Sequence, residues 1–276
     1  MQSVSGEGSV SKLVTELGSP VSYALPIGEQ ILPLNDWLGR TVRLQALGPI
    51  HCSHCGRRTK KSYSQGFCYP CMIKLARCDT CIMSPEKCHY EQGTCREPAW
   101  GEQFCMTDHI VYLANSSGLK VGIPRASQVP TRWIDQGASQ ALPIMRVANR
   151  RQSGLVEDLL RAQVADKTNW RALLRGEPDP VDMLAARDRL LDGAQPGLLA
   201  LQAEFGLQAI QPLDAAVVDI TYPVLEYSPK PQSANLDKEP VLEGTLLGIK
   251  GQYLMLDTGV INIRKYSSYT LSVSVS

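Results

Sequence analysis

Nine cysteines carry the most specific chemistry in this sequence of 276 residues, and all of them lie between Cys52 and Cys105. The first four follow the pattern C-x2-C-x12-C-x2-C, in which each C-x2-C pair can turn two thiolates toward one point. Four thiolates at about 2.3 Å suit a tetrahedral zinc ion. The spacing therefore predicts a first zinc site with the ligands Cys52, Cys55, Cys68 and Cys71.

The other five cysteines follow at wider spacings and predict a second metal: Cys78, Cys81, Cys88, Cys95 and Cys105. We expect a second zinc that uses Cys78 and Cys81 with two later ligands, and His89 and His109 lie in the same stretch. An iron–sulfur cluster is the alternative, because four thiolates at irregular spacing also hold one. Since nine is an odd number, one cysteine is expected to be spare.

Disulfides and unconnected buried cysteines are the competing interpretations of the same residues. The first fourteen residues have neither a basic stretch nor an apolar stretch of the kind found in secretion signals. We therefore expect a cytoplasmic protein, and a reducing compartment favours metal ligation over disulfides. No run of 18 apolar residues is present, so no membrane span is expected.

The net charge of +1 hides an uneven distribution along the chain. Residues 120–175 contain ten basic and four acidic residues, whereas residues 177–239 contain eleven acidic and four basic ones. A basic middle part beside metal knuckles is typical of proteins that bind DNA or RNA. The residues expected to contact a phosphate backbone are Arg57, Arg58, Lys60, Lys61, Arg150 and Arg151. The acidic part is a candidate docking surface for a protein partner.

Alternation and turn signals predict an α+β protein. Short strands are expected within residues 21–47, and little regular structure between residues 52 and 105. A strand-rich end is expected from Val241 to Val275, and we expect it to pair with the N-terminal strands. Between them, residues 109–164 predict the order β-β-α-β-α, with Ser153 capping the last helix. Two helices are expected within residues 180–205, the first capped by Asp179 and ended by Gly193.

These elements divide the chain into five expected units. They are an N-terminal β segment (1–50), a cysteine-rich metal-binding module (51–108), a β-β-α-β-α domain (109–176), a helical segment (177–226), and a linker with a C-terminal antiparallel β meander (227–276). The metal-binding module and the β-β-α-β-α domain contain the candidate functional residues. The other three units are expected to position them.

The β-β-α-β-α unit resembles the GIY-YIG nuclease superfamily over about 70 residues. The resemblance rests on Ile110-Val111-Tyr112, on Lys120-Val121-Gly122, and on Arg132 and Glu157 in the expected order. The whole chain also resembles an uncharacterised bacterial family marked by the cysteine knuckles and by two further motifs, GTCREPAWG (93–101) and TRWIDQGA (131–138).

The resemblance implies a nuclease active site. It implies that Tyr112 orients or deprotonates the attacking water, that Arg132 stabilises charge on the phosphoryl group, and that Glu157 binds a single Mg²⁺ or Mn²⁺ ion. Lys120 replaces the tyrosine of the second motif and Ile110 replaces the glycine of the first. A lysine can hold a phosphate or, with a lowered pKa, act as a base.

Three functions therefore remain open. The first is a metal-dependent endonuclease that binds nucleic acid through its zinc module. The second is a nucleic-acid-binding protein of the same architecture without catalysis, which the replacement at Lys120 favours. The third is a protein-interaction scaffold in which zinc is purely structural.

Overall fold

The computed structural model describes residues 4–164 and 169–276, so Asp166 and Lys167 of the basic stretch lie outside the described residues. The fold is a mixture of antiparallel sheets and a few helices, and the predicted α+β class is confirmed. No helix in the described part of the chain is both long enough and apolar enough to cross a bilayer.

The strands, in chain order, are β1 (Val4–Ser9), β2 (Val14–Glu16), β3 (Ser22–Ile27), β4 (Gln30–Pro33), β5 (Thr41–Ile50), β6 (His109–Asn115), β7 (Leu119–Gly122), β8 (Gln140–Val147), β9 (Ile210–Pro212), β10 (Val218–Asp219), β11 (Val241–Lys250), β12 (Tyr253–Leu256), β13 (Gly259–Asn262) and β14 (Tyr269–Val275). The α-helices are α1 (Tyr69–Lys74), α2 (Pro98–Phe104), α3 (Thr131–Asp135), α4 (Arg150–Arg161), α5 (Trp170–Leu173) and α6 (Met183–Phe205). The 3₁₀ helices are η1 (Asn35–Trp37), η2 (Ala76–Cys78), η3 (Thr80–Ile82), η4 (Pro85–Lys87), η5 (Ala126–Gln128) and η6 (Ile263–Tyr266).

The two ends of the chain build one sheet. Its strand order is β1-β14-β5-β11-β12-β13, and all its pairs are antiparallel. Alternate residues of β14 are buried, and β5 buries Val42 and Leu44 in the same two-residue rhythm. The predicted pairing of the first and last strands is therefore confirmed. Strands β2, β3 and β4 form a separate three-stranded sheet.

The middle of the chain forms a second, five-stranded sheet in the order β10-β8-β6-β7, with β9 also paired to β8. Strand β6 is buried on both faces: Val111 and Leu113 pack with α4 and α6, whereas Tyr112 and Ala114 join the core of the other sheets. This explains why its sequence is an unbroken apolar run. The predicted order β-β-α-β-α is confirmed by β6, β7, α3, β8 and α4.

Two helix predictions are wrong in detail. Helix α4 begins at Arg150, because the side chain of Asn149 accepts the backbone N–H of Gln152 at 2.9 Å; the Ser153 hydroxyl instead donates to the Arg150 carbonyl. Helix α6 is one helix that passes through Gly193 and Pro196, and its cap is Asp182 rather than Asp179.

Tertiary packing accounts for the continuity of α6. Leu190, Ala194 and Leu198, which lie on both sides of the predicted break, are buried in the same apolar cluster against the five-stranded sheet. Their burial outweighs the weak helix propensity of the glycine and the proline between them.

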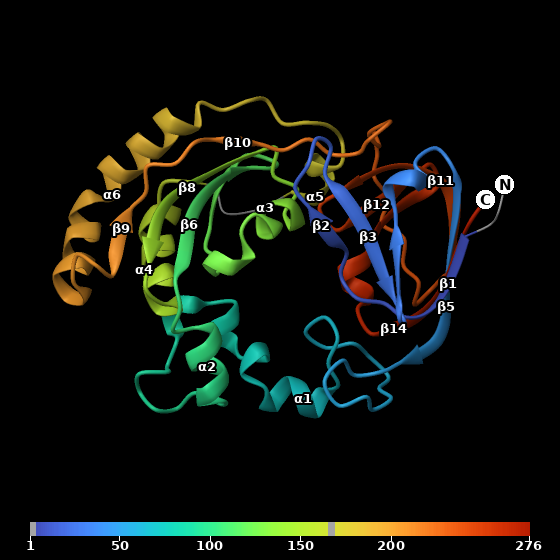
Figure 1. The fold of residues 1–276 in the computed structure, drawn as a ribbon, viewed down its shortest axis with the longest axis horizontal. Coiled ribbons are helices and arrows are strands. Elements are labelled where there is room, and N and C mark those ends of the chain that lie inside the picture. Colours follow the sequence, from blue (N-terminus) through green and yellow to red (C-terminus); the bar gives the residue numbers. More distant parts are fainter. Residues whose placement is uncertain (1–3, 165–168) are drawn as a thin grey trace.

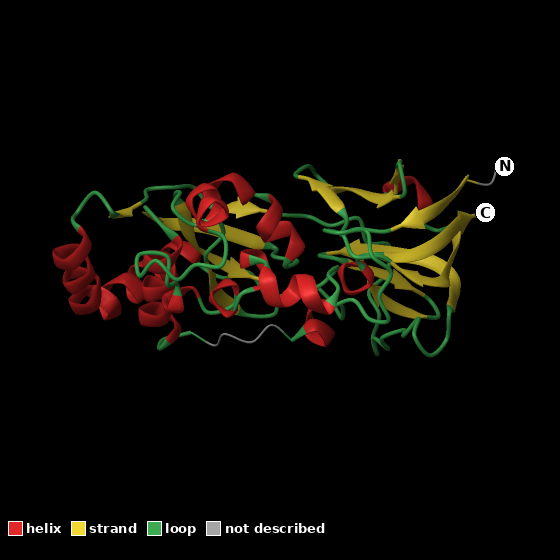
Figure 2. Ribbon diagram, turned by 90° about the horizontal axis from the view of Figure 1, so that it is seen from below, coloured by secondary structure: helices red, strands yellow, loops and turns green. Residues whose placement is uncertain are grey.

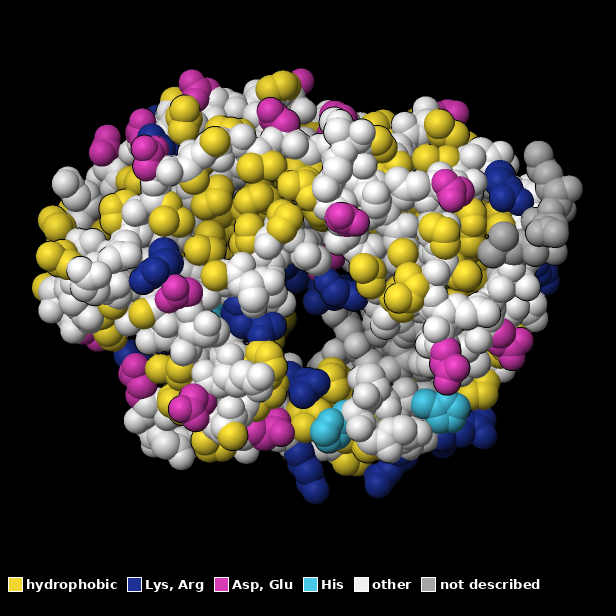
Figure 3. All heavy atoms as spheres, in the orientation of Figure 1, with side chains coloured by type: hydrophobic (Ala, Val, Ile, Leu, Met, Phe, Trp, Pro, Cys, Tyr) yellow, Lys and Arg dark blue, Asp and Glu magenta, His cyan; other side chains and the backbone are white. Residues whose placement is uncertain are grey.

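The cysteine-rich segment has more helix than predicted, although its helices are short. It runs from the end of β5 through α1 and η2 to η4 and reaches β6 through α2 (Figure 1, teal). Helices gather around the five-stranded sheet at one end of the molecule, and the strands of the chain ends lie at the other (Figure 2). Space filling shows a central opening between these parts, with Lys and Arg side chains along its rim (Figure 3).

Candidate functional site

The first four cysteines converge on one point. Cys52 and Cys55 follow β5 in a tight turn, in which Gly56 has a φ of +67° and donates its N–H to the Cys52 carbonyl at 2.9 Å. Cys68 caps α1, and Cys71 lies in its first turn. The four sulfur atoms all lie within 4.8 Å of one another.

Their geometry fits a zinc ion. A regular tetrahedron with zinc–sulfur bonds of about 2.3 Å separates the sulfur atoms by about 3.8 Å. The Cys55 and Cys68 sulfur atoms are 3.7 Å apart. Burial raises the pKa of the Cys52 thiol, but nearby backbone N–H groups outweigh this effect and lower the pKa to about 6. A thiolate is thereby favoured at neutral pH, as a metal ligand requires.

The remaining cysteines separate into two places. Cys81, Cys88, Cys95 and Cys105 line one small cavity, and the described residues that line it do not include Cys78. Of the two predicted histidines, His89 lines this cavity, whereas His109 is fully buried at the start of β6. His109 Nδ1 lies 2.7 Å from the Thr107 carbonyl oxygen, and its Nε2 has no hydrogen-bond partner among the described residues.

Three of the four residues predicted to be catalytic line a second cavity, a cleft of about 280 Å³. Lys120 comes from β7, Arg132 from α3 and Glu157 from α4, so three separate elements bring them together. Ile82, Met83 and Pro85 of the cysteine-rich segment also line the cleft. The cleft thus lies where the two middle units of the chain meet.

Tyr112 lies behind this cleft rather than in it. Its side chain is fully buried, and its hydroxyl donates to Gln136 Oε1 at 2.9 Å. Gln136 in turn lines the cleft. A Cβ on Gly122, the paired residue of β7, would lie only 2.5 Å from the tyrosine Cζ. Burial raises the pKa of Tyr112 well above its usual value, so the phenol stays protonated and acts as a donor.

Glu157, the predicted cation ligand, and the neighbouring Asp158 both form ion pairs with Arg161. The Glu157 side chain is 13% exposed, and its Oε2 lies 3.1 Å from Arg161 Nη2. Asp158 is 45% exposed and lies 3.4 Å from the other Arg161 terminal nitrogen, Nη1. Only Glu157 of this acidic pair lines the cleft.

The predicted nucleic-acid contacts fall into two groups. Arg57, Arg58, Lys60 and Lys61 are exposed on the loop between the first two ligand pairs. Arg150 lines the cleft, and its Nη2 donates to the Ile82 carbonyl at 2.9 Å. Arg151 pairs with Glu91 at 3.2 Å and lies over the ring of Phe205.

Some residues of interest were not predicted. Gln136 and Arg161 both line the cleft, and the position of Arg161 four residues after Glu157 was a helical signal for it. The fully buried Lys250 lies 3.2 Å from Glu177 and over the rings of Tyr222 and Tyr227. Nothing in the local pattern of β11 indicated such burial of a lysine.

Fold and clusters define an α+β protein with a four-cysteine site that can hold a metal such as zinc. The family described as "protein of unknown function (DUF2797)" matches residues 39–271, so the chain belongs to that uncharacterised family. A search of curated proteins found no match. The chain also matches no solved structure.

Proposed function

We propose that this protein binds nucleic acid and hydrolyses its phosphodiester bonds in the cleft, with a divalent cation at Glu157. The observation that carries the proposal is the convergence of Lys120, Arg132 and Glu157 in one cleft. They come from three elements, and their order and spacing resemble a GIY-YIG nuclease. Residues that matched the motif by chance would not be expected to lie together in one cleft.

The chemistry of the cleft suits a phosphodiester. The Arg132 guanidinium can form paired hydrogen bonds with phosphate oxygens, and Lys120 adds a second positive charge. Mg²⁺ typically binds through one or two carboxylates together with substrate phosphates, so a single partly exposed carboxylate fits it. A bound divalent cation would act as a Lewis acid on the phosphodiester.

Tyr112 acts as a positioning residue in this proposal. Its phenol stays protonated and holds the Gln136 amide at the edge of the cleft. The amide is then available to orient a water molecule or a phosphate oxygen. The close packing of the ring against Gly122 fixes the distance between β7 and the tyrosine.

The surface around the cleft suits a polyanion. A hollow of about 650 Å³ is lined by Lys12, Arg77 and Arg264. Burial and the nearby charge of Arg132 both lower the pKa of Arg264, which means that the cations of the two cavities are close enough to interact. Together with the rim of the central opening in Figure 3, these cations provide a positive path for a phosphate backbone.

The zinc module contributes a second binding surface. Its loop exposes Arg57, Arg58, Lys60 and Lys61, and Tyr69 is 54% exposed beside Tyr63. Aromatic rings next to cations can stack on unpaired bases. The zinc at the first site holds this loop, and a further metal ion held by the later cysteines is also structural in this proposal.

A non-catalytic nucleic-acid-binding protein is the second candidate, and the observation that favours it is the lysine at position 120, where the resembled nucleases have a tyrosine. A protein scaffold is the third, supported by the acidic character of residues 177–239. These candidates differ in two measurable properties, cleavage and salt-dependent binding.

The experiment compares wild-type protein with Glu157→Gln and Asp158→Asn on labelled single- and double-stranded DNA and RNA, with Mg²⁺ or Mn²⁺. Both acids contact Arg161, so both variants weaken a similar ion pair. Loss of an interaction worth several kcal/mol in the transition state predicts at least a ~100-fold slower cleavage for Glu157→Gln only. Binding should remain and should weaken steeply with salt.

Two results contradict the proposal in different ways. Salt-dependent binding without cleavage by wild-type protein supports the non-catalytic candidate. If the protein binds none of the four nucleic acids at low salt, both nucleic-acid functions are refuted and the protein scaffold is the remaining candidate.

A further inference from the structure

Four cysteines outside the first four-cysteine site line one small cavity. These cysteines come from four places in the chain: Cys81 lies in η3, Cys88 follows η4, Cys95 lies in the next loop, and Cys105 follows α2. Cys81, Cys88 and Cys105 are each no more than 9% exposed. Their spacing, C-x6-C-x6-C-x9-C, contains no C-x2-C knuckle and is therefore not evident in the sequence.

The cavity itself is small. Its volume is about 10 Å³, which is the space of a single water-sized sphere. A four-iron cluster with its sulfides needs several times that space and would displace the thiols that form the walls. The size therefore fits one ion. Buried thiols around one site also match the closed coordination of structural zinc.

Gly101 allows the backbone of α2 to pack closely against Cys95 and Tyr90. A Cβ at this position would lie 3.2 Å from the Cys95 sulfur and 2.8 Å from the ring of Tyr90. The backbone of α2 thus approaches the cysteine so closely that only a glycine fits. Tyr90 and Trp100 line the same cavity and shield it from solvent.

Cys78 lies apart from these four cysteines. It does not line the cavity, although Cys81 is only three residues away. Burial raises the pKa of its thiol, and Ser64, which lies between Cys55 and Cys68, and Cys52 are among the residues that also affect this pKa. The nine cysteines thereby divide into two groups of four and one spare, and the spare is Cys78.

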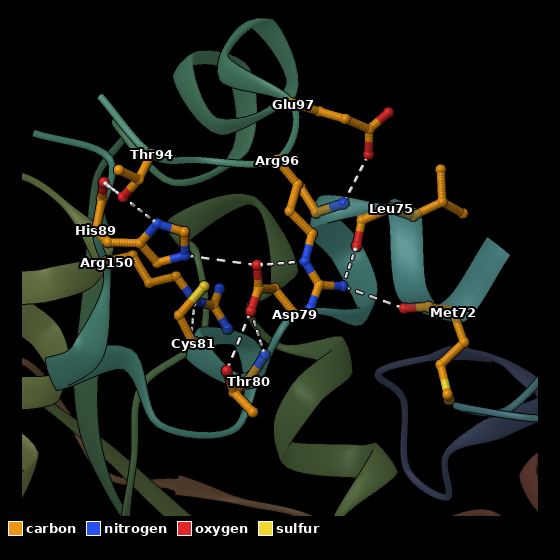
Figure 4. Close-up of polar contacts among 11 residues, drawn as sticks. Met72, Leu75, Asp79, Thr80, Cys81, His89, Thr94, Arg96, Glu97 and Arg150 are labelled. Atoms are coloured by element: carbon orange, nitrogen blue, oxygen red, sulfur yellow. Dashed lines mark hydrogen bonds and ion pairs between the residues drawn. The ribbon is translucent and has the colours of Figure 1, made fainter. Parts of the chain in front are cut away.

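A competing ligand set also has to be considered. Asp79, Cys81 and His89 offer atoms that lie within 4.8 Å of one another. In Figure 4, Asp79 and His89 contact each other as well as their neighbours: His89 Nε2 lies 3.4 Å from Asp79 Oδ2, which also accepts from Arg96 Nε at 2.7 Å, and His89 Nδ1 lies 2.8 Å from Thr94 Oγ1. Asp79 Oδ1 accepts the N–H of Thr80 at 2.6 Å. The carboxylate therefore stabilises the loops around the thiols.

Arg150 connects the four cysteines to helix α4. Its Nε donates to the Cys81 carbonyl at 3.3 Å, and its backbone N–H donates to the Cys105 carbonyl at 2.8 Å. A zinc ion with four thiolates carries two negative charges, so a guanidinium at this place also balances charge. Glu157 lies seven residues further along the same helix.

We propose that Cys81, Cys88, Cys95 and Cys105 bind a second zinc ion, which fixes the N-terminus of α4 through Arg150. None of its four ligands lines the cleft, although Arg150 does, so the ion would take no part in the reaction proposed there. Its effect on the cleft is positional: the ion holds the segment with Ile82, Met83 and Pro85 against the helix that carries Glu157.

The test is metal stoichiometry of the whole chain, purified without chelator, by native mass spectrometry and elemental analysis. Wild-type protein should contain two zinc ions per chain, Cys88→Ser or Cys95→Ser one, and Cys55→Ser one. Cys78→Ser is the matched control and should retain two. Wild-type protein with one zinc, or a Cys78→Ser variant with one, refutes the ligand set.

A second measurement does not depend on the folding of variants. Zinc X-ray absorption of wild-type protein should show four sulfur ligands at about 2.3 Å for both ions together, with no nitrogen or oxygen. A nitrogen or oxygen contribution would indicate the set with Asp79 and His89 instead. Iron with visible absorbance refutes the single-ion site. Glu157→Gln should retain two zinc ions, so failure of the proposed nuclease activity leaves this result unaffected.

Discussion

Gly154 in helix α4 provides a substitution for which helix propensity and packing predict opposite signs. Replacing a helical glycine with alanine ordinarily stabilises a helix by about 1 kcal/mol. Here, an added Cβ would lie 2.2 Å from the backbone nitrogen of Glu86 and 2.6 Å from the carbonyl carbon of Pro85. Both contacts are with the backbone of η4, so no rotamer change can relieve them.

The structure yields an approximate magnitude. Forcing extra volume into a packed contact costs about 1–3 kcal/mol, and the upper end applies because the backbone must move by roughly 1 Å. Subtracting the gain in propensity leaves a net destabilisation of about 2 kcal/mol for Gly154→Ala. With a urea m-value of about 3 kcal/mol/M, the midpoint of unfolding should fall by about 0.7 M.

Gly193→Ala in α6 is the matched control. There, an added Cβ meets the amide end of Gln163, which is exposed and flexible, at 2.3 Å. The amide can rotate away, and the gain in propensity should then remain, so the urea midpoint should rise. Equilibrium urea unfolding followed by circular dichroism measures both variants. A Gly154→Ala protein as stable as wild type would refute the close contact between α4 and the cysteine-rich segment.

Three other predictions follow from single contacts. Gly122→Ala should destabilise the protein by about 1–3 kcal/mol in urea unfolding and slow any cleavage, because the new Cβ overlaps the ring of Tyr112; unchanged stability would contradict the tight packing. Pro196→Ala should raise the stability by up to about 3 kcal/mol, because the exposed proline interrupts the hydrogen bonding of α6; a decrease in melting temperature would show that the helix needs the proline. Burial, together with Arg150 and Arg125, lowers the pKa of His109 to about 4, so between pH 6.5 and pH 4 this side chain is protonated in the unfolded chain and neutral in the folded chain. The free energy of unfolding should therefore fall by about 3 kcal/mol as the pH decreases across this interval. His109→Asn should remove that part of the pH dependence.

The regular elements were predictable because their signals are local. The alternation in β5 and β14, and the turn between β6 and β7, each follow from a few neighbouring residues. The same holds for the first four cysteines, whose C-x2-C pairs bring two ligands together over a single turn. The extent of α6 was not predictable, because the burial of Leu190, Ala194 and Leu198 depends on a sheet built from distant residues.

The grouping of the last five cysteines was likewise not predictable from local sequence. The sequence pattern favoured Cys78 with Cys81, since they form the next C-x2-C pair. In the structure, η2 ends at Cys78 and η3 begins at Thr80, and only Cys81 of this pair lines the small cavity. Whether a C-x2-C pair forms a knuckle thus depends on the conformation of the residues between the cysteines, which the spacing alone does not specify.

The proposed second zinc site and the cleft are supported by the same elements of the fold. The cysteine-rich segment and α4, with Glu157, both line the cleft. The two are held together by Arg150, by the contact between Gly154 and η4, and by the thiols behind them. Since a segment with so little regular structure has no large apolar core of its own, metal ions at the two proposed sites would supply most of its folding free energy. If the proposed ligand set is right, loss of the second ion should therefore open the cleft without any change in the residues that line it.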